Sequence, residues 1–280
     1  NQLTVRSAEK EEILLCHTED YYNKVELEAR NCHTREVKTL STGDVEICSN
    51  SFKVAKLAVG GGLVAVDAVM KNIAKKVFCN IRPPGHHACS NQGMGFCIFN
   101  NIAIAARYAQ ETYGIKRVLI IDWDIHHGNG TQEIFYNDPS VFYFSTHQAN
   151  HYPFSGLKSE RGVENIMNIP IKEGIESAQS VIEAFKNHLI PAMEQFKPEL
   201  ILISAGFDAH KDDPLGGFNL EVNDFGILTN IAVDLANEYC EGKIVSMLEG
   251  GYNLKALASS VLEHVKVLSV DEDDSNPQGL

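Results

Sequence analysis

Two carboxylates and an imidazole alternate along one short segment, Asp122-x-Asp124-x-His126. In an extended chain alternate side chains point the same way, so this spacing lets two of them approach one ion. A carboxylate with an imidazole suits a borderline cation such as zinc, which needs a third ligand from another segment. Asp208 is the best such donor. The pattern predicts a metal site; the alternative is that Asp122 and Asp124 only cap a strand-to-loop turn.

A second candidate is the pair His86-His87, which follows a Pro-Pro-Gly turn. Pro83 and Pro84 fix the backbone and Gly85 permits a close approach, so both imidazoles can be held beside a metal-bound water. Imidazole titrates near neutrality, which suits proton transfer in hydrolysis. Away from such a site, the pair would be a surface or packing feature.

The third candidate is Glu249-Gly-Gly-Tyr252. Two glycines let the backbone bend sharply and bring a phenol over a cavity, where its hydroxyl could donate to a developing oxyanion. The alternative is that Tyr252 is a half-buried core aromatic. Gly93-Met-Gly95-Phe96 lacks the strand and helix of a dinucleotide fold, and the chain has no Gly-Lys-Ser/Thr loop, so nucleotide binding is disfavoured.

The elements that position these residues are short apolar runs rich in β-branched residues, which predict buried strands. These runs are 76–81, 117–122, 200–205 and 243–249, with 141–145 as a fifth. Helical patterns lie between them at 52–72, 100–113, 176–195, 221–240 and 254–267. This alternation predicts one α/β domain over residues 1–270, built on a mostly parallel sheet flanked by helices. The acidic segment 271–280 is expected to be a flexible tail.

Each candidate motif begins where one of the predicted strands ends. In open parallel sheets, ligand sites gather beyond the carboxyl ends of the strands. Four such endings, after 81, 121, 205 and 248, carry His, Asp, Glu or Tyr side chains within a few residues. We therefore expect the functional site at that edge of the sheet.

The composition excludes several classes of function. The 280 residues are 44% hydrophobic and carry a net charge of −13 with no basic run, so direct nucleic-acid binding is not expected. The sequence contains no stretch of about 18 consecutive apolar residues, so a membrane span is not expected. Seven cysteines without a Cys-x-x-Cys pair indicate free thiols in a reducing compartment, the cytoplasm or the nucleus. The oligomeric state stays open.

Six motifs in this order resemble those of the zinc-dependent histone deacetylases, most closely the class II branch and its bacterial relatives. They are Arg82-Pro-Pro-Gly-His-His-Ala88, Gly95-Phe-Cys97, Asp122-Trp-Asp-Ile-His-His-Gly-Asn-Gly-Thr131, Ser204-Ala-Gly-Phe-Asp208, Asp213-Pro-Leu-Gly-Gly217 and Leu248-Glu-Gly-Gly-Tyr-Asn253. The resemblance runs from about Arg6 to Val267. It implies the arginase/deacetylase α/β fold, with a parallel sheet of about eight strands. Relatives usually begin with an extra strand and loop, so two alternatives stay open: the sequence is truncated at its N-terminal edge, or that edge of the domain is trimmed.

The resemblance also implies a role for each site residue. The zinc ligands would be Asp124, His126 and Asp208. His86 and His87 would be the proton-transfer histidines, and Tyr252 the phenol that polarises the carbonyl. Asp122 would buttress His86, and Asn129 would buttress His87. Partners of this kind set the tautomer and basicity of an imidazole.

The resemblance further implies a narrow acyl-lysine channel and a second cation. Gly95, Phe96 and Tyr152 would line the channel, Tyr152 standing where relatives usually carry Phe, and Asp44 would anchor the substrate backbone. Leu215 falls where polyamine-selective relatives carry Glu. A monovalent cation, usually K⁺, would bind the Asp122 and Ser145 side chains and the carbonyls of three residues, Asp124, His126 and Thr146.

The function implied is zinc-dependent removal of acetyl or other acyl groups from lysine side chains of proteins. Substrates such as histones or tubulin-like proteins, and a role as a chromatin regulator, follow from the same resemblance. Three alternatives stay open: deacetylation of small amines such as acetylpolyamines, a catalytically silent acetyl-lysine-binding scaffold, and a binuclear ureohydrolase-like enzyme. Retention of Tyr252 with all three ligands argues against the scaffold. The hydrophobic Trp123 and Ile125 argue against the binuclear site, which needs more metal ligands.

Overall fold

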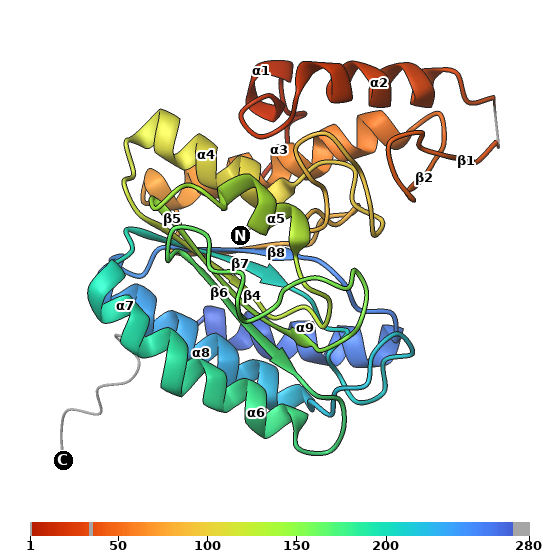
Figure 1. The fold of residues 1–280 in the computed structure, drawn as a ribbon. Coiled ribbons are helices and arrows are strands. Elements are labelled where there is room, and N and C mark those ends of the chain that lie inside the picture. The colour runs from red at the N-terminus through yellow and green to blue at the C-terminus, as the bar shows by residue number, and fades with distance from the viewer. Residues whose placement is uncertain (1, 34–35, 271–280) are drawn as a thin grey trace, which may run out of the picture.

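The computed structural model describes residues 2–33 and 36–270 and has a central parallel sheet between layers of helices (Figure 1). The sheet order is β3-β8-β7-β4-β5-β6. Its strands are β3 (Lys76–Cys79), β4 (Val118–Asp122), β5 (Val141–Gln148), β6 (Ile166–Ile171), β7 (Leu200–Ala205) and β8 (Ile244–Leu248). The expected tail at 271–280 lies outside the described residues. The α/β fold with a parallel sheet flanked by helices is confirmed.

The expectation of about eight strands in the sheet is wrong: the described residues form six there. Two further short strands, β1 (Lys38–Thr39) and β2 (Glu46–Ile47), pair with each other as a separate antiparallel ribbon. The number eight came with the resemblance, whereas the apolar runs of the chain itself predicted five strands. The apolar pattern did not predict the sixth strand, β6, because it is a half-buried edge strand. It also contains Pro170, and proline disfavours a strand prediction except at such an edge.

The helices cover both faces of the sheet (Figure 1). On one face lie α3 (Ser51–Met70), α4 (Asn101–Tyr113) and the short α5 (Asn129–Phe135), with α1 (Lys10–Ile13) and α2 (Glu19–Arg30) packed outside them. On the other lie α6 (Ser177–Ala184), a π-helical turn at Phe185–Leu189, α7 (Ile190–Phe196), α8 (Val222–Tyr239) and α9 (Leu254–Leu268). The predicted helices are all present, that at 176–195 being divided by the π-turn. None of the described helices is long and apolar enough to cross a membrane.

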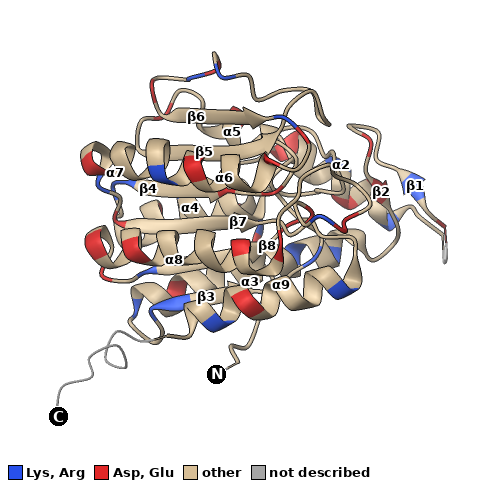
Figure 2. Cartoon of the chain, turned by 90° about the horizontal axis from the view of Figure 1, so that it is seen from below, with Lys and Arg blue, Asp and Glu red and all other residues tan. Residues whose placement is uncertain are grey.

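Strand β4 shows why the sheet needs both layers. All five of its residues are fully buried. Leu119 and Ile121 point into the core under α6–α9, whereas Val118 and Ile120 point into the core under α3 and α4. The central strands β5, β7 and β8 contain no charged residues, and the charges gather on helices and loops (Figure 2). The centre of the sheet is therefore buried and largely apolar, and the charged groups of the site lie at the strand ends.

Candidate active site

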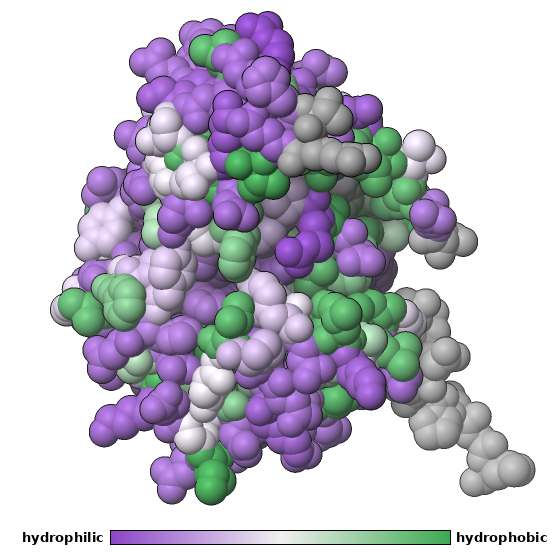
Figure 3. Space-filling model, turned by 90° about the vertical axis from the view of Figure 1, so that its right-hand side faces the viewer, coloured by the Kyte–Doolittle hydropathy of each residue, from purple (hydrophilic) through white to green (hydrophobic). Residues whose placement is uncertain are grey.

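Strand register brings the predicted motifs to one edge of the sheet. Asp122, the last residue of β4, pairs with Ser204 of β7 and with Ser145 of β5. On the far side of β7, Ala205 pairs with Leu248 of β8. The chain therefore leaves these neighbouring strands at the same level, on the side of the molecule that faces the viewer in Figure 3. Apolar and hydrophilic side chains are interspersed on that face.

A buried cluster of Asp124, His126 and Asp208 could hold a metal ion, since one ligand atom from each lies within 4.8 Å of the others. Nδ1 of His126 lies 2.9 Å from Oδ1 of Asp124 and 3.1 Å from Oδ2 of Asp208. Backbone N–H groups hold the other two carboxylate oxygens. Gly250 donates to Oδ2 of Asp124 at 2.8 Å, and Ile125 donates to Oδ1 of Asp208 at 3.0 Å.

The cluster fits a divalent cation. Oδ2 of Asp208 is buried and forms no hydrogen bond among the described residues; its near polar neighbour is Nδ1 of His126, at 3.1 Å. A Cβ at Gly250 would lie 2.1 Å from that oxygen, so only glycine allows the main chain this close. Burial lowers the pKa of His126, but the carboxylates of Asp124 and Asp208 outweigh it and raise the pKa to about 11. Two carboxylates and an imidazole in a field that favours positive charge suit Zn²⁺.

His86 lies in an acidic environment. Its Nδ1 lies 3.0 Å from Oδ2 of Asp122, which also accepts a hydrogen bond from the hydroxyl of Tyr143 at 2.9 Å. The backbone N–H of His86 donates to Glu249 at 3.2 Å. Burial lowers the pKa of His86, but Asp122, then Asp124 and Glu249, outweigh burial and raise it to about 10. These carboxylates therefore favour the protonated form of His86.

His87, by contrast, has a neutral partner. Its Nδ1 lies 2.8 Å from Oδ1 of Asn129. The amide of Asn129 is oriented by its Nδ2, which donates to the backbone oxygen of His87 and to Sγ of Cys89, each at 3.4 Å. Burial and the charge of His86 hold the pKa of His87 well below its usual range. His87 is therefore a neutral imidazole that donates through Nδ1 and keeps Nε2 free to accept a proton.

A narrow pocket of about 40 Å³ opens beside this cluster. Its ten lining residues are Pro84, His86, His87, Gly95, Phe96, His126, Tyr152, Leu215, Gly250 and Tyr252. The ring of Tyr152 stands edge-on to His87 at 5.3 Å, and the ring of Phe96 lies 6.1 Å from that of Tyr252. Burial, then the nearby carboxylates, raises the pKa of Tyr252, so its hydroxyl stays protonated as a donor.

Hydrogen bonds join the loops around the mouth of this pocket. Asp44 accepts from the backbone N–H of Gly95 at 2.9 Å and from the hydroxyl of Tyr152 at 2.9 Å. The neighbouring His151 bonds through Nε2 to the backbone oxygen of Leu215 at 3.0 Å. The loop that carries His151 and Tyr152 is therefore joined to a segment on either side. Asp44, which the resemblance gave as the anchor of the substrate backbone, bonds to two residues that line the pocket.

The residues expected to bind a monovalent cation also lie together, because Asp122 and Ser145 are register partners on β4 and β5. Each side chain has a protein partner: the hydroxyl of Tyr143 donates to Asp122, and Oγ of Ser145 lies 2.9 Å from Nδ1 of His147. K⁺ at this point stays a prediction.

Sequence reasoning assigned no role to several residues that support the site. Glu249 is buried and accepts from the backbone N–H of Gly85 at 2.7 Å and from Oγ of Ser204 at 2.9 Å. Glu249 directly follows a predicted strand, and this position could have indicated that it belongs to the site. Tyr143, in contrast, lies inside a buried apolar strand, where a tyrosine is ordinary, so nothing in the sequence distinguished it.

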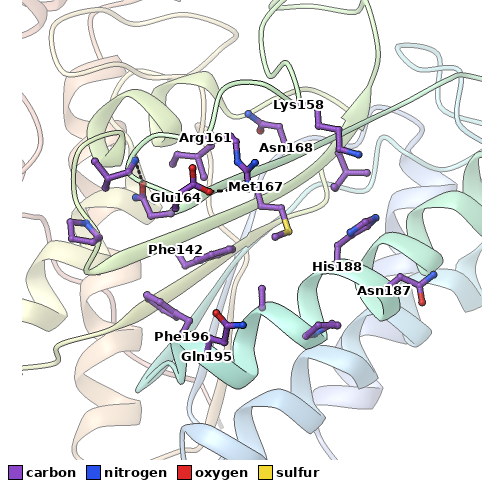
Figure 4. Close-up of a pocket in the computed structure, with 17 residues that line it drawn as sticks. Phe142, Lys158, Arg161, Glu164, Met167, Asn168, Asn187, His188, Gln195 and Phe196 are labelled. Atoms are coloured by element: carbon purple, nitrogen blue, oxygen red, sulfur yellow. Dashed lines mark hydrogen bonds and ion pairs between the residues drawn. The ribbon is translucent and has the colours of Figure 1, made fainter.

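A larger pocket of about 780 Å³ lies elsewhere, along β6 and α7 (Figure 4). Phe142, Met167 and Phe196 give it apolar walls, and Lys158 and Arg161 lie on its opposite side. It shares no lining residue with the narrow pocket. None of the predicted site residues lines it, so its size does not make it the candidate active site.

A parallel sheet with a candidate metal centre and paired histidines at its carboxyl edge is typical of metal-dependent α/β hydrolases. The histone deacetylase domain profile matches residues 1–268. The chain belongs to the histone deacetylase family, a family of zinc-dependent hydrolases.

Three curated relatives and one solved structure illustrate the likeness. The chain is 42% identical to an uncharacterized protein of Synechocystis sp. (slr0245), covering 91% of this chain and 81% of that protein. It is 40% identical to the chloroplastic histone deacetylase 10 of Oryza sativa subsp. japonica, with coverage of 91% and 60%. It is 39% identical to the polyamine deacetylase HDAC10 of Danio rerio, with coverage of 95% and 40%. The crystal structure of an HDA15 HD domain matches with a TM-score of 0.87 at 36% identity, covering 95% of this chain and 74% of that one.

The relatives bear on three expectations: the activity, the cellular location and the substrate of this chain. The chain spans 60% or less of the rice and zebrafish proteins, so their activities as whole proteins do not transfer directly. A chloroplastic relative and a Synechocystis relative argue against the nuclear location and the chromatin role that the resemblance implied. The family includes proteins named for histones and for polyamines, so family membership leaves the substrate open.

Proposed function

We propose that the chain removes acetyl groups from lysine side chains of proteins. The observation that carries this proposal is the lining of the narrow pocket. None of its ten described lining residues is Asp or Glu, and Leu215 stands 41% exposed at its mouth. An apolar wall suits the methylene stem of a lysine, whereas a second ammonium of an acetylpolyamine would need a carboxylate there.

Asp124, His126 and Asp208 would hold Zn²⁺, the fit of which rests on the buried, unpartnered oxygen of Asp208. When bound, zinc would supply Lewis-acid polarisation of the amide carbonyl and a water whose pKa lies near neutrality. Nε2 of His87 would act as the base for the attacking water, because its Nδ1–H is committed to Asn129. The water oxygen would bond to the amide carbonyl carbon and the C–N bond would break, while the proton held on His87 would pass to the lysine amine that leaves, giving acetate and free lysine.

The other residues of the pocket stabilise charge and exclude water. His86, held as an imidazolium by Asp122, places a positive charge near the reacting centre. The hydroxyl of Tyr252 donates to the carbonyl oxygen as its negative charge develops. Phe96 and Tyr152 flank the acyl-lysine stem. We also propose that residues 1–270 form one catalytic domain.

The test compares acetate release from acetyl-lysine peptides with release from N-acetylated spermidine and putrescine. The parent protein should give the higher kcat/KM on peptides. Leu215→Glu should shift the ratio toward polyamines by about 5–150-fold, the equivalent of about 1–3 kcal/mol for a partly desolvated ion pair. Leu215→Gln, of similar size without charge, is the matched control. A parent that already prefers the polyamine would overturn the proposal in favour of an acetylpolyamine deacetylase.

A further inference from the structure

Asp213 lies beside the pocket in the loop between β7 and α8, and the mechanism above gives it no role. Its side chain is buried, with 6% exposed. Oδ2 accepts hydrogen bonds from the backbone N–H groups of Tyr252 at 2.7 Å and Asn253 at 3.1 Å. Oδ1 accepts from the backbone N–H of Leu215 at 3.0 Å. One carboxylate therefore joins the main chain of the candidate phenol to the mouth of the pocket.

Fixed segments lie on both sides of Tyr252. On its N-terminal side, Gly250 donates to Asp124 at 2.8 Å and accepts from the N–H of Phe207 at 2.9 Å, and Gly251 has φ +137°, a conformation that L side chains rarely adopt. On its C-terminal side, Asn253 caps helix α9 by accepting from the N–H groups of Lys255 and Ala256. Between these segments, the N–H groups of Tyr252 and Asn253 both bond to Asp213, so its carboxylate sets the orientation of the Tyr252 backbone.

We propose that Asp213 is a positioning residue that holds the hydroxyl of Tyr252 over the narrow pocket. This inference rests on the proposed role of Tyr252 as the donor to the carbonyl oxygen. Bonds from N–H groups to a buried carboxylate are about twice as strong as neutral ones, and three of them fix a segment in one geometry. Asn at 213 keeps the volume but offers one acceptor oxygen in place of two, and its NH₂ group would face an N–H donor.

The experiment is a double-mutant cycle of Asp213→Asn with Tyr252→Phe, measured as kcat and KM on an acetyl-lysine peptide. Asp213→Asn alone should lower kcat by about 10–100-fold, because a displacement near 1 Å of a catalytic group has a cost of that order. KM and bound zinc should stay close to the parent values. In the Tyr252→Phe background the same change should have almost no further effect, because the hydroxyl it positions is already absent.

Asp212→Asn is the matched control, because the neighbouring carboxylate is 62% exposed and lies 3.8 Å from His210, outside the hydrogen bonds that hold Tyr252. It should leave both constants unchanged. Equal losses from Asp213→Asn in both backgrounds, or loss of zinc, would overturn the positioning role while leaving the proposed function intact. A Tyr252→Phe protein with the parent kcat would overturn the positioning role and the role of Tyr252 as a donor, while peptide cleavage by the parent would still support the proposed function. Asp213→Glu, which keeps the charge on a longer stem, runs the same cycle if Asp213→Asn does not fold.

Discussion

The floor and the mouth of the narrow pocket are built in different ways. At the floor, Asp122, Asp124 and Asp208 are completely buried, and strand register or backbone N–H groups fix them. At the mouth, Phe96 is 56% exposed and Leu215 is 41% exposed, and hydrogen bonds to the side chains of Asp44, His151 and Asp213 join the loops. The sheet therefore determines the chemistry, whereas loop side chains that can change without disturbing the sheet determine which substrate enters.

The largest effect should come from removing a charge at the floor. Asp208→Asn keeps the volume and the acceptor for Ile125 but removes a negative ligand, so bound zinc should fall sharply. Activity should fall on the order of 10³-fold or more, because a catalytic metal contributes several kcal/mol. Elemental analysis and acetate release measure both. The exposed Asp234→Asn should retain the metal and the rate. Full zinc occupancy with unchanged activity in Asp208→Asn would show that the floor does not hold the metal.

The next largest effect should come from the phenol between floor and mouth. Tyr252→Phe keeps the ring and deletes the donor, so substrate should still bind while kcat falls by about 10²–10³. The measurement is kcat against substrate affinity. Tyr239→Phe, on helix α8 away from the pocket, controls for loss of a hydroxyl. A rate within about threefold of the parent would make Tyr252 a packing residue.

In the core, the stability of the fold should fall at acid pH because of one buried histidine, His264. His264 is buried between Thr229 and Ser246, with ring nitrogens 2.7 and 2.8 Å from their hydroxyl oxygens. Burial lowers its pKa to about 3. In the unfolded chain its pKa is about 6.5, so the unfolded state binds the extra proton between these values. The stability that neutral His264 contributes is complete above about pH 6.5 and is lost as the pH falls toward 3.

Urea unfolding at pH 7 and pH 5 measures this loss, which should be on the order of 1–2 kcal/mol for His264. His264→Gln should reduce the difference between the two pH values by that amount. The exposed His188→Gln should leave the difference as it is in the parent. An unaltered difference in His264→Gln would mean that the pKa of His264 is the same in the folded and the unfolded chain.

The smallest effect should come from the mouth. Tyr152→Phe removes the hydroxyl that donates to Asp44 but keeps the ring against His87. We expect KM on peptides to rise a few-fold with kcat nearly unchanged, because a hydrogen bond to a partly exposed carboxylate contributes about 1 kcal/mol. Steady-state kinetics on the peptide separates the two constants. A loss in kcat as large as that of Tyr252→Phe would contradict the division between floor and mouth.

Prediction from sequence was most accurate where a periodic pattern met a strand end. The apolar runs located β3, β4, β5, β7 and β8 to within three residues at either end, because a buried strand must be apolar on both faces. The helices α1, α2 and α5, the short strands β1 and β2 and the edge strand β6 were missed. A seven-residue helix has little periodicity, and an edge strand has one half-exposed face.

The sequence by itself determined which side chains could do chemistry and that they follow the strands of one parallel sheet. Residue type and spacing are local properties, and the carboxyl ends of parallel strands necessarily meet at one edge. The pairing of His86 with Asp122 and of His87 with Asn129 was expected from the resemblance and not from any local pattern, and the structure has both contacts. Only the tertiary structure decided that Asp213 contacts the backbone of Tyr252. These contacts join segments up to 42 residues apart in the chain, and which groups meet across such distances depends on strand order, loop path and packing. No local pattern encodes them.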